Sequence, residues 1–371
     1  MTRHVTAMTV SEPRARFLRS EVEIDDPGAD EVLVRIEAVG MCHSDLAARA
    51  GDFPFPLPGV LGHEGSGIVE SVGTDVTSVR AGDRVMLTFD SCGHCGNCIS
   101  GAPSRCRIFL AHNFTNGSRP DGKPALWQDG QAIHGNFFGQ SSFATYALAR
   151  ERNTVVVPEL AADLAPELLA PLGCGIQTGA GAVLNVLKPG AASAVAVFGA
   201  GAVGLSAVMA AALLPLRELI VVDIQDSRLD LAKRLGATKV VNSRSADPVE
   251  ALKELTGGGP DFVVESSGVP AVLAQAIKSL GNGGTAGVVG VPAFGTTAPV
   301  DVADIVNDSK RIMGIVEGRS NPQVFLPQLA GLVASGRLPV GELVKTFPLE
   351  EIERAAEAMK SGEAIKPVLL P

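Results

Sequence analysis

The chain has 371 residues, which is too long for one ordinary hydrophobic core and predicts two domains. Its 31 basic and 40 acidic residues give a net charge of −9 without a basic patch, which argues against nucleic acid and anionic membranes as partners. We therefore expect a small-molecule substrate. The first residues contain no apolar core of signal-peptide length, which predicts a cytoplasmic protein.

Short strands dominate the first half of the sequence. Apolar patterns predict strands at residues 31–39, 68–72 and 83–87, separated by Gly and Pro turns. No long helix is expected before about residue 160. The polar, Gly- and Pro-rich residues 119–135 are expected to form a long surface loop. These features together predict an all-β domain.

A short run in this domain places a thiol, an imidazole, a hydroxyl and a carboxylate side by side, at Cys42, His43, Ser44 and Asp45. A thiolate is a strong zinc ligand, and a carboxylate can orient a further ligand. Alone, the run is weak evidence, because a single cysteine is usually a small buried side chain and a loop histidine is usually solvated. His63, Glu64 and Cys174 change this interpretation, because the runs together offer two thiolates and one imidazole to a metal.

The strongest single motif has the pattern Cys-x2-Cys-x2-Cys-x7-Cys and consists of Cys92, Cys95, Cys98 and Cys106. Four thiolates complete the tetrahedral coordination of zinc and leave no open position, so the motif predicts a structural zinc site. An iron–sulfur cluster or a redox disulfide pair is the alternative. In a reducing cytosol, none of the six cysteines needs to form a disulfide.

Strand and helix patterns alternate after Cys174. Strands are predicted at residues 194–198, 219–222, 239–241, 262–265 and 284–290, and helices at an Ala-rich segment ending at Leu214 and at residues 226–235, 248–255 and 271–280. This alternation predicts a doubly wound parallel sheet. The uncharged residues 191–216 are long enough to cross a bilayer, but Gly and Pro interrupt them, and we interpret them as strand, turn and helix.

A Gly-x-Gly-x-x-Gly motif, Gly199, Gly201 and Gly204, lies between a predicted strand and helix. Asp223 ends the next strand about twenty residues further on. Such glycines let backbone amides approach a pyrophosphate, and the carboxylate accepts hydrogen bonds from the adenosine ribose. A tight turn without a ligand is the alternative. The motif predicts NAD as the cofactor.

The order of these motifs resembles the zinc-dependent medium-chain alcohol dehydrogenases, from about residue 30 to the end of the chain. The resemblance implies an α/β fold with a β-rich GroES-like catalytic domain, residues 1–175 and 318–371, and a doubly wound Rossmann NAD-binding domain, residues 176–317. The predicted helices at 322–335 and 350–360 and the predicted strand at 367–370 are assigned to the first domain on this basis alone.

The resemblance also implies roles for individual residues. Cys42, His63 and Cys174 would bind a catalytic zinc, with Asp45 orienting His63 and Glu64 close behind the metal. The four-cysteine motif would hold a structural zinc, giving two zinc ions per chain. The implied cofactor contacts, besides the glycines, are His43, Thr178, Val203, Asp223, Arg228, Val289 and Val291. Ser44 would pass on the alcohol proton, but Ala47 replaces the histidine that ends this relay in liver-type enzymes.

The substrate is suggested by residues 136–146, which resemble the corresponding stretch of aryl-alcohol (benzyl alcohol) dehydrogenases. This implies reversible oxidation of a primary aromatic or allylic alcohol; packing of the segment in the core is the alternative. Cys174 argues against polyol dehydrogenases, and the thiols argue against zinc-free quinone reductases. A thiol-adduct formaldehyde dehydrogenase and a non-catalytic dinucleotide-binding sensor remain as alternatives. The family resemblance implies a homodimer, with a tetramer as the alternative, joined near residues 311–316.

Overall fold

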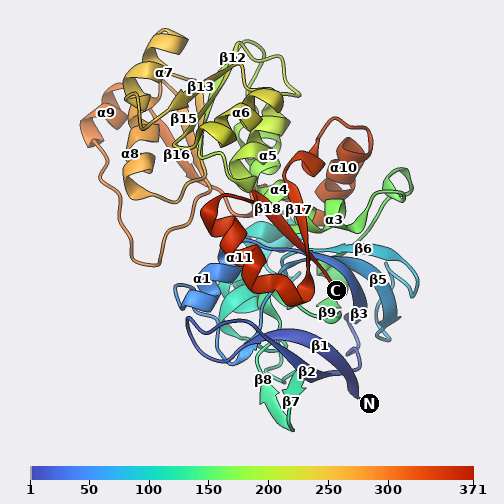
Figure 1. Cartoon of the computed structure of the whole chain (residues 1–371). Coiled ribbons are helices and arrows are strands. Elements are labelled where there is room, and N and C mark those ends of the chain that lie inside the picture. The colour runs from blue at the N-terminus through green and yellow to red at the C-terminus, as the bar shows by residue number, and fades with distance from the viewer. Residues whose placement is uncertain (1) are drawn as a thin grey trace. The chain divides into compact units, whose positions relative to one another are not determined.

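The computed structural model describes Thr2–Pro371 (Figure 1). The chain divides into two compact units. One contains the described residues of Met1–Cys174 together with Asn321–Pro371, and the other is Gly175–Ser320. The C-terminal segment therefore folds with the N-terminal half, although the second unit lies between them in the sequence.

Two mainly antiparallel sheets form the first unit within residues 2–371. The smaller sheet has the order β4-β1-β2-β7-β8, with β4 Gly59–Val60, β1 Thr2–Val10, β2 Leu18–Asp25, β7 Leu126–Gln128 and β8 Gln131–Ile133. The larger has the order β10-β6-β5-β3-β18-β17, with β10 Thr154–Val156, β6 Arg84–Leu87, β5 Glu64–Val72, β3 Glu31–Gly40, β18 Lys366–Leu370 and β17 Val344–Pro348, while β9 Tyr146–Arg150 also pairs with β3. Strand β18 thus brings the C-terminal segment directly beside β3.

The expectation that residues 119–135 form a loop is wrong for the second half of this segment, where β7 and β8 form a hairpin. Asp129 and Gly130 have φ values of 51° and 73°, as in the two-residue turn that suits a hairpin. Trp127 pairs with Ala132 across the hairpin and donates from Nε1 to Asp25 Oδ1 at 3.1 Å. The Asp-Gly dipeptide was the sequence signal for this turn.

The helices of the first unit are α1 His43–Ala50, α2 Gly96–Ile99, α3 Pro166–Leu169, α10 Pro322–Ala334 and α11 Ile352–Ser361. Helix α1 lies before about residue 160, where no long helix is expected, and no sequence pattern predicted it. It has eight residues and ends at Gly51, so it is too short to show a clear helical period in the sequence. Because α1 begins at His43, the residues Ser44 and Asp45 lie in its first turn.

The second unit is a parallel sheet with the order β13-β12-β11-β14-β15-β16 within the described residues. Its strands are β11 Ala194–Phe198, β12 Glu218–Asp223, β13 Lys239–Asn242, β14 Phe262–Glu265, β15 Thr285–Val288 and β16 Arg311–Gly314. Its helices are α4 Gly175–Gly181, α5 Ala202–Ala211, α6 Asp226–Arg234, α7 Pro248–Thr256, α8 Pro270–Ser279 and α9 Val302–Asn307. This strand order is that of a doubly wound dinucleotide-binding fold.

Local sequence explains why these elements begin and end where they do. Asp247 caps α7 by accepting from the backbone N–H of Val249 at 2.8 Å, and Pro248 occupies the first helical position. The central strands β11, β12 and β14 are mostly apolar and buried, as expected where a parallel sheet is covered on both faces. No helix within residues 2–371 is long and apolar enough to cross a membrane.

Candidate active site and metal centres

Three separate segments of the first unit meet at one buried cluster. Cys42 lies between β3 and α1, His63 precedes β5, and Cys174 follows a short 3-10 helix, Ala170–Gly173. One ligand atom from each of these residues and from Glu64 lies within 4.8 Å of the others. His63 and Glu64 are fully buried. The structure therefore brings together the two thiols and the imidazole that the sequence offers.

Asp45 holds this cluster in place. Its carboxylate accepts from the backbone N–H of Cys42 at 2.8 Å and of Gly62 at 3.0 Å, and lies 2.9 Å from His63 Nδ1. Because Nδ1 faces a carboxylate, we assign the ring proton to it, which leaves the lone pair on Nε2. His63 Nε2 is buried and has no hydrogen-bond partner in the part of the chain that the structure describes.

A buried imidazole nitrogen without a partner, beside two thiols, has the properties of a metal ligand. Contact with the Cys174 thiol, and then with His63 and the positive Lys366, holds the pKa of Cys42 well below its usual value despite burial. The thiolate is the form that binds metals. The residues present therefore fit a zinc ion, which two sulfurs and one nitrogen would hold.

Lys366 was not anticipated as a site residue. It lies in β18, is 2% exposed, and its Nζ is 2.9 Å from both carboxylate oxygens of Glu64 and 3.1 Å from the carbonyl oxygen of Met41. Burial would lower the pKa of Lys366, but the charges of Glu64 and Cys42 outweigh it and the pKa is raised. A lone lysine in an otherwise apolar strand was the sequence signal for a buried acidic partner.

Ser44 lies beside the cluster, on the first turn of α1. Its Oγ is 3.9 Å from the Cys42 Sγ, and its side chain is half-buried. His43 is exposed at the start of the same helix, and Ala47 lies one turn further on. A hydroxyl in this position can exchange a proton with a group bound next to the Cys42 sulfur.

The four cysteines of the second motif form another cluster, Cys92, Cys95, Cys98 and Cys106, whose sulfurs all lie within 4.8 Å of one another. None of them forms a disulfide in the described chain. The backbone N–H of Cys92 points at Cys106 Sγ, and that of Cys95 at Cys92 Sγ, both at 3.3 Å. His94 instead contacts the Cys92 carbonyl oxygen. The donor set fits a closed zinc site of four sulfurs.

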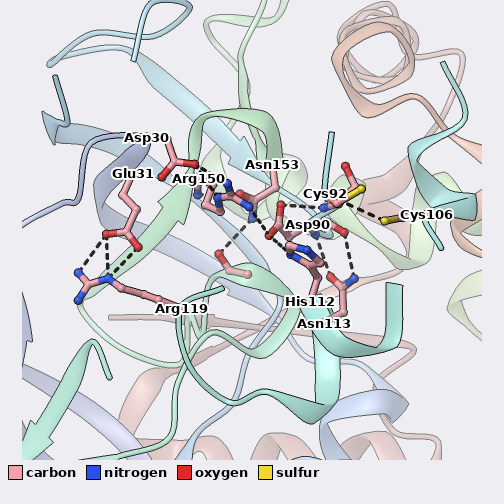
Figure 2. Close-up of polar contacts among 12 residues, drawn as sticks. Asp30, Glu31, Asp90, Cys92, Cys106, His112, Asn113, Arg119, Arg150 and Asn153 are labelled. Atoms are coloured by element: carbon pink, nitrogen blue, oxygen red, sulfur yellow. Dashed lines mark hydrogen bonds and ion pairs between the residues drawn. The ribbon is translucent and has the colours of Figure 1, made fainter. Parts of the chain in front are cut away.

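A buried polar network fixes the start of this cysteine lobe (Figure 2). Asp90 Oδ2 lies 2.8 Å from His112 Nδ1 and 3.4 Å from an Arg150 nitrogen. Asn113 brackets the Asp90 backbone, accepting from its N–H at 2.8 Å and donating to its carbonyl oxygen at 3.0 Å. No motif marks these residues in the sequence, because their pairing depends on the folded chain. The network holds the backbone just before Cys92.

We expect Cys95→Ser to impair folding, because a closed four-thiolate site contributes free energy to the folded state. The variant should give less folded protein, a lower unfolding temperature and one zinc ion fewer per chain. His94→Ala is the matched control, since His94 lies in the same lobe outside the sulfur set. Cys95→Ser protein with wild-type stability and zinc content would show that the cluster is not a zinc site.

The glycine motif of the second unit has the backbone that a dinucleotide needs. Gly199 has a φ of 91°, and a Cβ on Gly204 would lie 1.8 Å from the Gly199 carbonyl oxygen. Both positions therefore require glycine. A Cβ on Gly201 would meet nothing within 4 Å, so glycine there leaves space open above the first turn of α5. This arrangement fits a pyrophosphate approaching the helix N-terminus.

Asp223 lies at the end of β12 and is fixed by backbone amides. Its carboxylate accepts from Ala200 at 2.7 Å, Ile224 at 2.8 Å and Gln225 at 2.9 Å. The first of these bonds ties the acid directly to the glycine turn. These bonds hold the carboxylate in position beside the space above α5.

The remaining predicted cofactor residues of the second unit are placed as follows. Thr178 lies on α4 and donates to Glu317 at 3.3 Å. No sequence pattern indicated Glu317 as a neighbour of the predicted cofactor residues. Arg228 lies on α6, and its Nε is buried without a hydrogen-bond partner in the described chain. Val203 is half-buried on α5, whereas Val289 is buried and Val291 is 67% exposed, both after β15.

Comparison with known proteins agrees with this geometry. Residues 28–159 match the alcohol dehydrogenase GroES-like domain, and residues 202–334 match the zinc-binding dehydrogenase domain. A geraniol dehydrogenase from Castellaniella defragrans is 45% identical over 350 residues, which are 94% of this chain and 93% of that protein.

Two solved structures are similar over nearly the whole chain. An alcohol dehydrogenase zinc-binding domain protein from Burkholderia ambifaria has a TM-score of 0.97 and 51% identity, with all of both chains covered. A benzyl alcohol dehydrogenase from Acinetobacter calcoaceticus has a TM-score of 0.95 and 47% identity, with 99% of both chains covered. The chain belongs to the zinc-binding medium-chain alcohol dehydrogenases. The predicted fold class, a GroES-like domain with a Rossmann domain, is confirmed.

Proposed function

We propose that this alcohol dehydrogenase oxidises a primary aromatic or allylic alcohol to the aldehyde, reversibly, with zinc at the Cys42, His63 and Cys174 cluster and hydride transfer to NAD. The single observation that carries the proposal is the buried His63 Nε2, which has no hydrogen-bond partner in the described chain and lies beside two thiols. A second zinc ion is proposed for the four-cysteine lobe.

Each residue near the cluster has a separate role in the proposed reaction. Bound zinc supplies a Lewis acid that lowers the pKa of an alcohol placed on it. Asp45 fixes the orientation of His63, and Ser44 Oγ accepts the proton that the alcohol loses while it passes on its own hydroxyl proton. Ala47 has no proton acceptor, so we propose that the proton leaves towards water rather than through a histidine at that position.

The substrate class is supported by the relatives and by the surroundings of His63. Geraniol and benzyl alcohol, which name two of these relatives, are both primary alcohols with an unsaturated carbon beside the carbinol. Aromatic rings are concentrated near the imidazole, among them Phe114 and the half-buried Phe109, which both pack against Phe138. Aromatic walls favour flat, unsaturated groups over saturated chains.

Initial rates with benzyl alcohol, geraniol, ethanol and a secondary alcohol test this proposal. We expect the highest kcat/KM with one of the first two. A preference for the secondary alcohol, or for ethanol, would contradict the substrate class. Oxidation of formaldehyde that requires an added low-molecular-weight thiol would instead support the thiol-adduct alternative.

We expect the wild type to prefer NAD over NADP, because the Asp223 carboxylate would lie close to a 2′-phosphate and repel it. Asp223→Ser should narrow the preference for NAD over NADP by about tenfold or more. Loss of a repulsion of about 1.4 kcal/mol between the carboxylate and the 2′-phosphate corresponds to a factor of ten. Asp226→Ser, an exposed acid on the next helix, is the control. The ratio of kcat/KM for the two cofactors measures the effect, and a wild type that prefers NADP would refute the assignment.

We also propose that two copies pair through β16, the strand at one edge of the parallel sheet. Ile312 in β16 is 43% exposed, and Val316 just beyond it is also exposed, so the edge offers apolar side chains and free backbone groups. Light scattering should give a dimer, and Ile312→Glu should give a monomer. A monomeric wild type would contradict the proposal, and so would Ile312→Glu protein that stays fully dimeric.

A further inference from the structure

Residues 136–142 have an unusual backbone. Asn136, Phe138 and Ser141 have φ values of 64°, 51° and 52°, in the left-handed region that residues with a side chain avoid. Each such residue costs on the order of 1 kcal/mol, and this strain persists only where the surroundings impose it. The segment, which contains a short 3-10 helix, Phe137–Gly139, is buried from Phe137 onwards. The contacts of its side chains account for this backbone.

Phe137 and Phe138 enclose the imidazole of His63. The Phe138 ring is stacked on the His63 ring, with centroids 4.3 Å apart and planes at 18°. Phe137 meets the imidazole edge-on at 5.4 Å and 82°. Asp45 already fixes one nitrogen of the ring, and the two phenylalanines restrict rotation of its plane. The direction of the His63 Nε2 lone pair is therefore set by this segment.

Gln140 fixes the backbone on both sides of Glu64. Its Nε2 donates to the His63 carbonyl oxygen at 2.8 Å, and its Oε1 accepts from the Gly65 N–H at 3.0 Å. Ser142 Oγ donates to the same Oε1 at 2.9 Å. The side chain is 2% exposed, so these bonds are shielded from water.

The same amide reaches towards Cys174. Gln140 Nε2 also donates to the Thr88 carbonyl oxygen at 3.1 Å, and Thr88 Oγ1 donates to the Gly173 carbonyl oxygen at 2.7 Å. Gly173 directly precedes Cys174, and a Cβ on Gly173 would lie 2.1 Å from the Leu87 carbonyl oxygen. One buried hydrogen-bond path thus joins the backbones of His63 and Cys174.

We propose that Phe138 and Gln140 are positioning residues of the metal centre: Phe138 sets the plane of the His63 ring, and Gln140 sets the spacing of the His63 and Cys174 backbones. This inference rests on the proposed metal-binding role of those two residues. It gives residues 136–142 a function in shaping metal coordination.

Gln140→Met and Phe138→Leu test the proposal, because each removes the contacts and keeps a similar volume. Groups that orient metal ligands typically contribute about 10- to 100-fold to metal affinity. We expect both variants to transfer zinc from the His63 centre to a chromophoric chelator about 10- to 100-fold faster than wild type. The rates are measured below the unfolding transition. The visible spectrum of protein carrying Co²⁺ at this centre should also change.

A matched control separates positioning from general packing. Phe347→Leu removes a buried ring elsewhere in the first unit. This variant should leave the chelator rate and the Co²⁺ spectrum unchanged, even where its unfolding temperature falls. If Gln140→Met does not fold, Gln140→Glu removes only the two amide donors and keeps the acceptor.

Folded Gln140 and Phe138 variants that keep the wild-type chelator rate and Co²⁺ spectrum would overturn the inference. If such variants show a changed ratio of kcat/KM for benzyl alcohol to kcat/KM for geraniol, the segment acts on the substrate instead. Wild-type protein that binds no metal through His63 would refute the proposed function itself, which is a separate result.

Discussion

Cys174→Ser is expected to give a folded protein that has lost alcohol oxidation by on the order of 1,000-fold in kcat/KM. Lewis-acid stabilisation at a catalytic metal contributes several kcal/mol, and each 1.36 kcal/mol is a factor of ten in rate. A serine hydroxyl replaces the thiolate poorly as a zinc ligand, because it stays protonated at neutral pH. Cys174 is buried at the cluster with Cys42 and His63.

Metal analysis and circular dichroism accompany the rate measurement. We expect the zinc content to fall from two ions per chain to one, with the remaining ion in the four-cysteine lobe and the far-ultraviolet spectrum unchanged. This result would contrast with Cys95→Ser, for which folding itself should suffer. Full activity of Cys174→Ser, or two tightly held zinc ions in it, would mean that Cys174 is not a ligand.

Lys366→Met is expected to destabilise the first unit strongly. It leaves Glu64, which is fully buried, without the ammonium group that contacts both of its oxygens. Removing one partner of a buried ion pair typically costs about 3–5 kcal/mol, because the other charge stays in the protein interior. Burial already raises the pKa of Glu64, and loss of Lys366 would raise this pKa further.

A double-mutant cycle shows whether the pair itself is responsible. Glu64→Gln combined with Lys366→Met removes both charges, and we expect it to recover most of the unfolding temperature that Lys366→Met loses. Lys345→Met is the control, since Lys345 forms an exposed pair with Glu363 and should change stability little. Additive effects of the two substitutions at 64 and 366 would show that the ion pair does not couple them.

Local patterns predicted the second unit well. Strands β11 and β14 begin and end where their apolar runs predict, because a strand buried in a parallel sheet is apolar along its whole length. The glycine motif was also visible in the sequence, and the local backbone requires glycine at Gly199 and Gly204. In contrast, α1 and the β7–β8 hairpin were missed, because each is too short for a period to stand out among polar residues.

The ligand residues could be proposed from spacing and family resemblance, but their supports could not. Lys366 contacts Glu64 across 302 positions of sequence, and Gln140 contacts His63 across 77. Neither contact leaves a local pattern. Residues 136–146 were interpreted as a clue to the substrate, yet Phe137 and Phe138 are buried against His63. Their resemblance to aryl-alcohol enzymes fits a shared metal centre as well as a shared substrate.

Stepwise removal of zinc tests the central role of the Cys42, His63 and Cys174 cluster most directly. Oxidation of benzyl alcohol with NAD is measured while a chelator removes metal and zinc content is counted in parallel. We expect activity to disappear with the first ion removed, the fold and the second ion to persist, and one added equivalent of Zn²⁺ to restore the rate. Undiminished activity after loss of both ions would contradict zinc-dependent catalysis at this cluster.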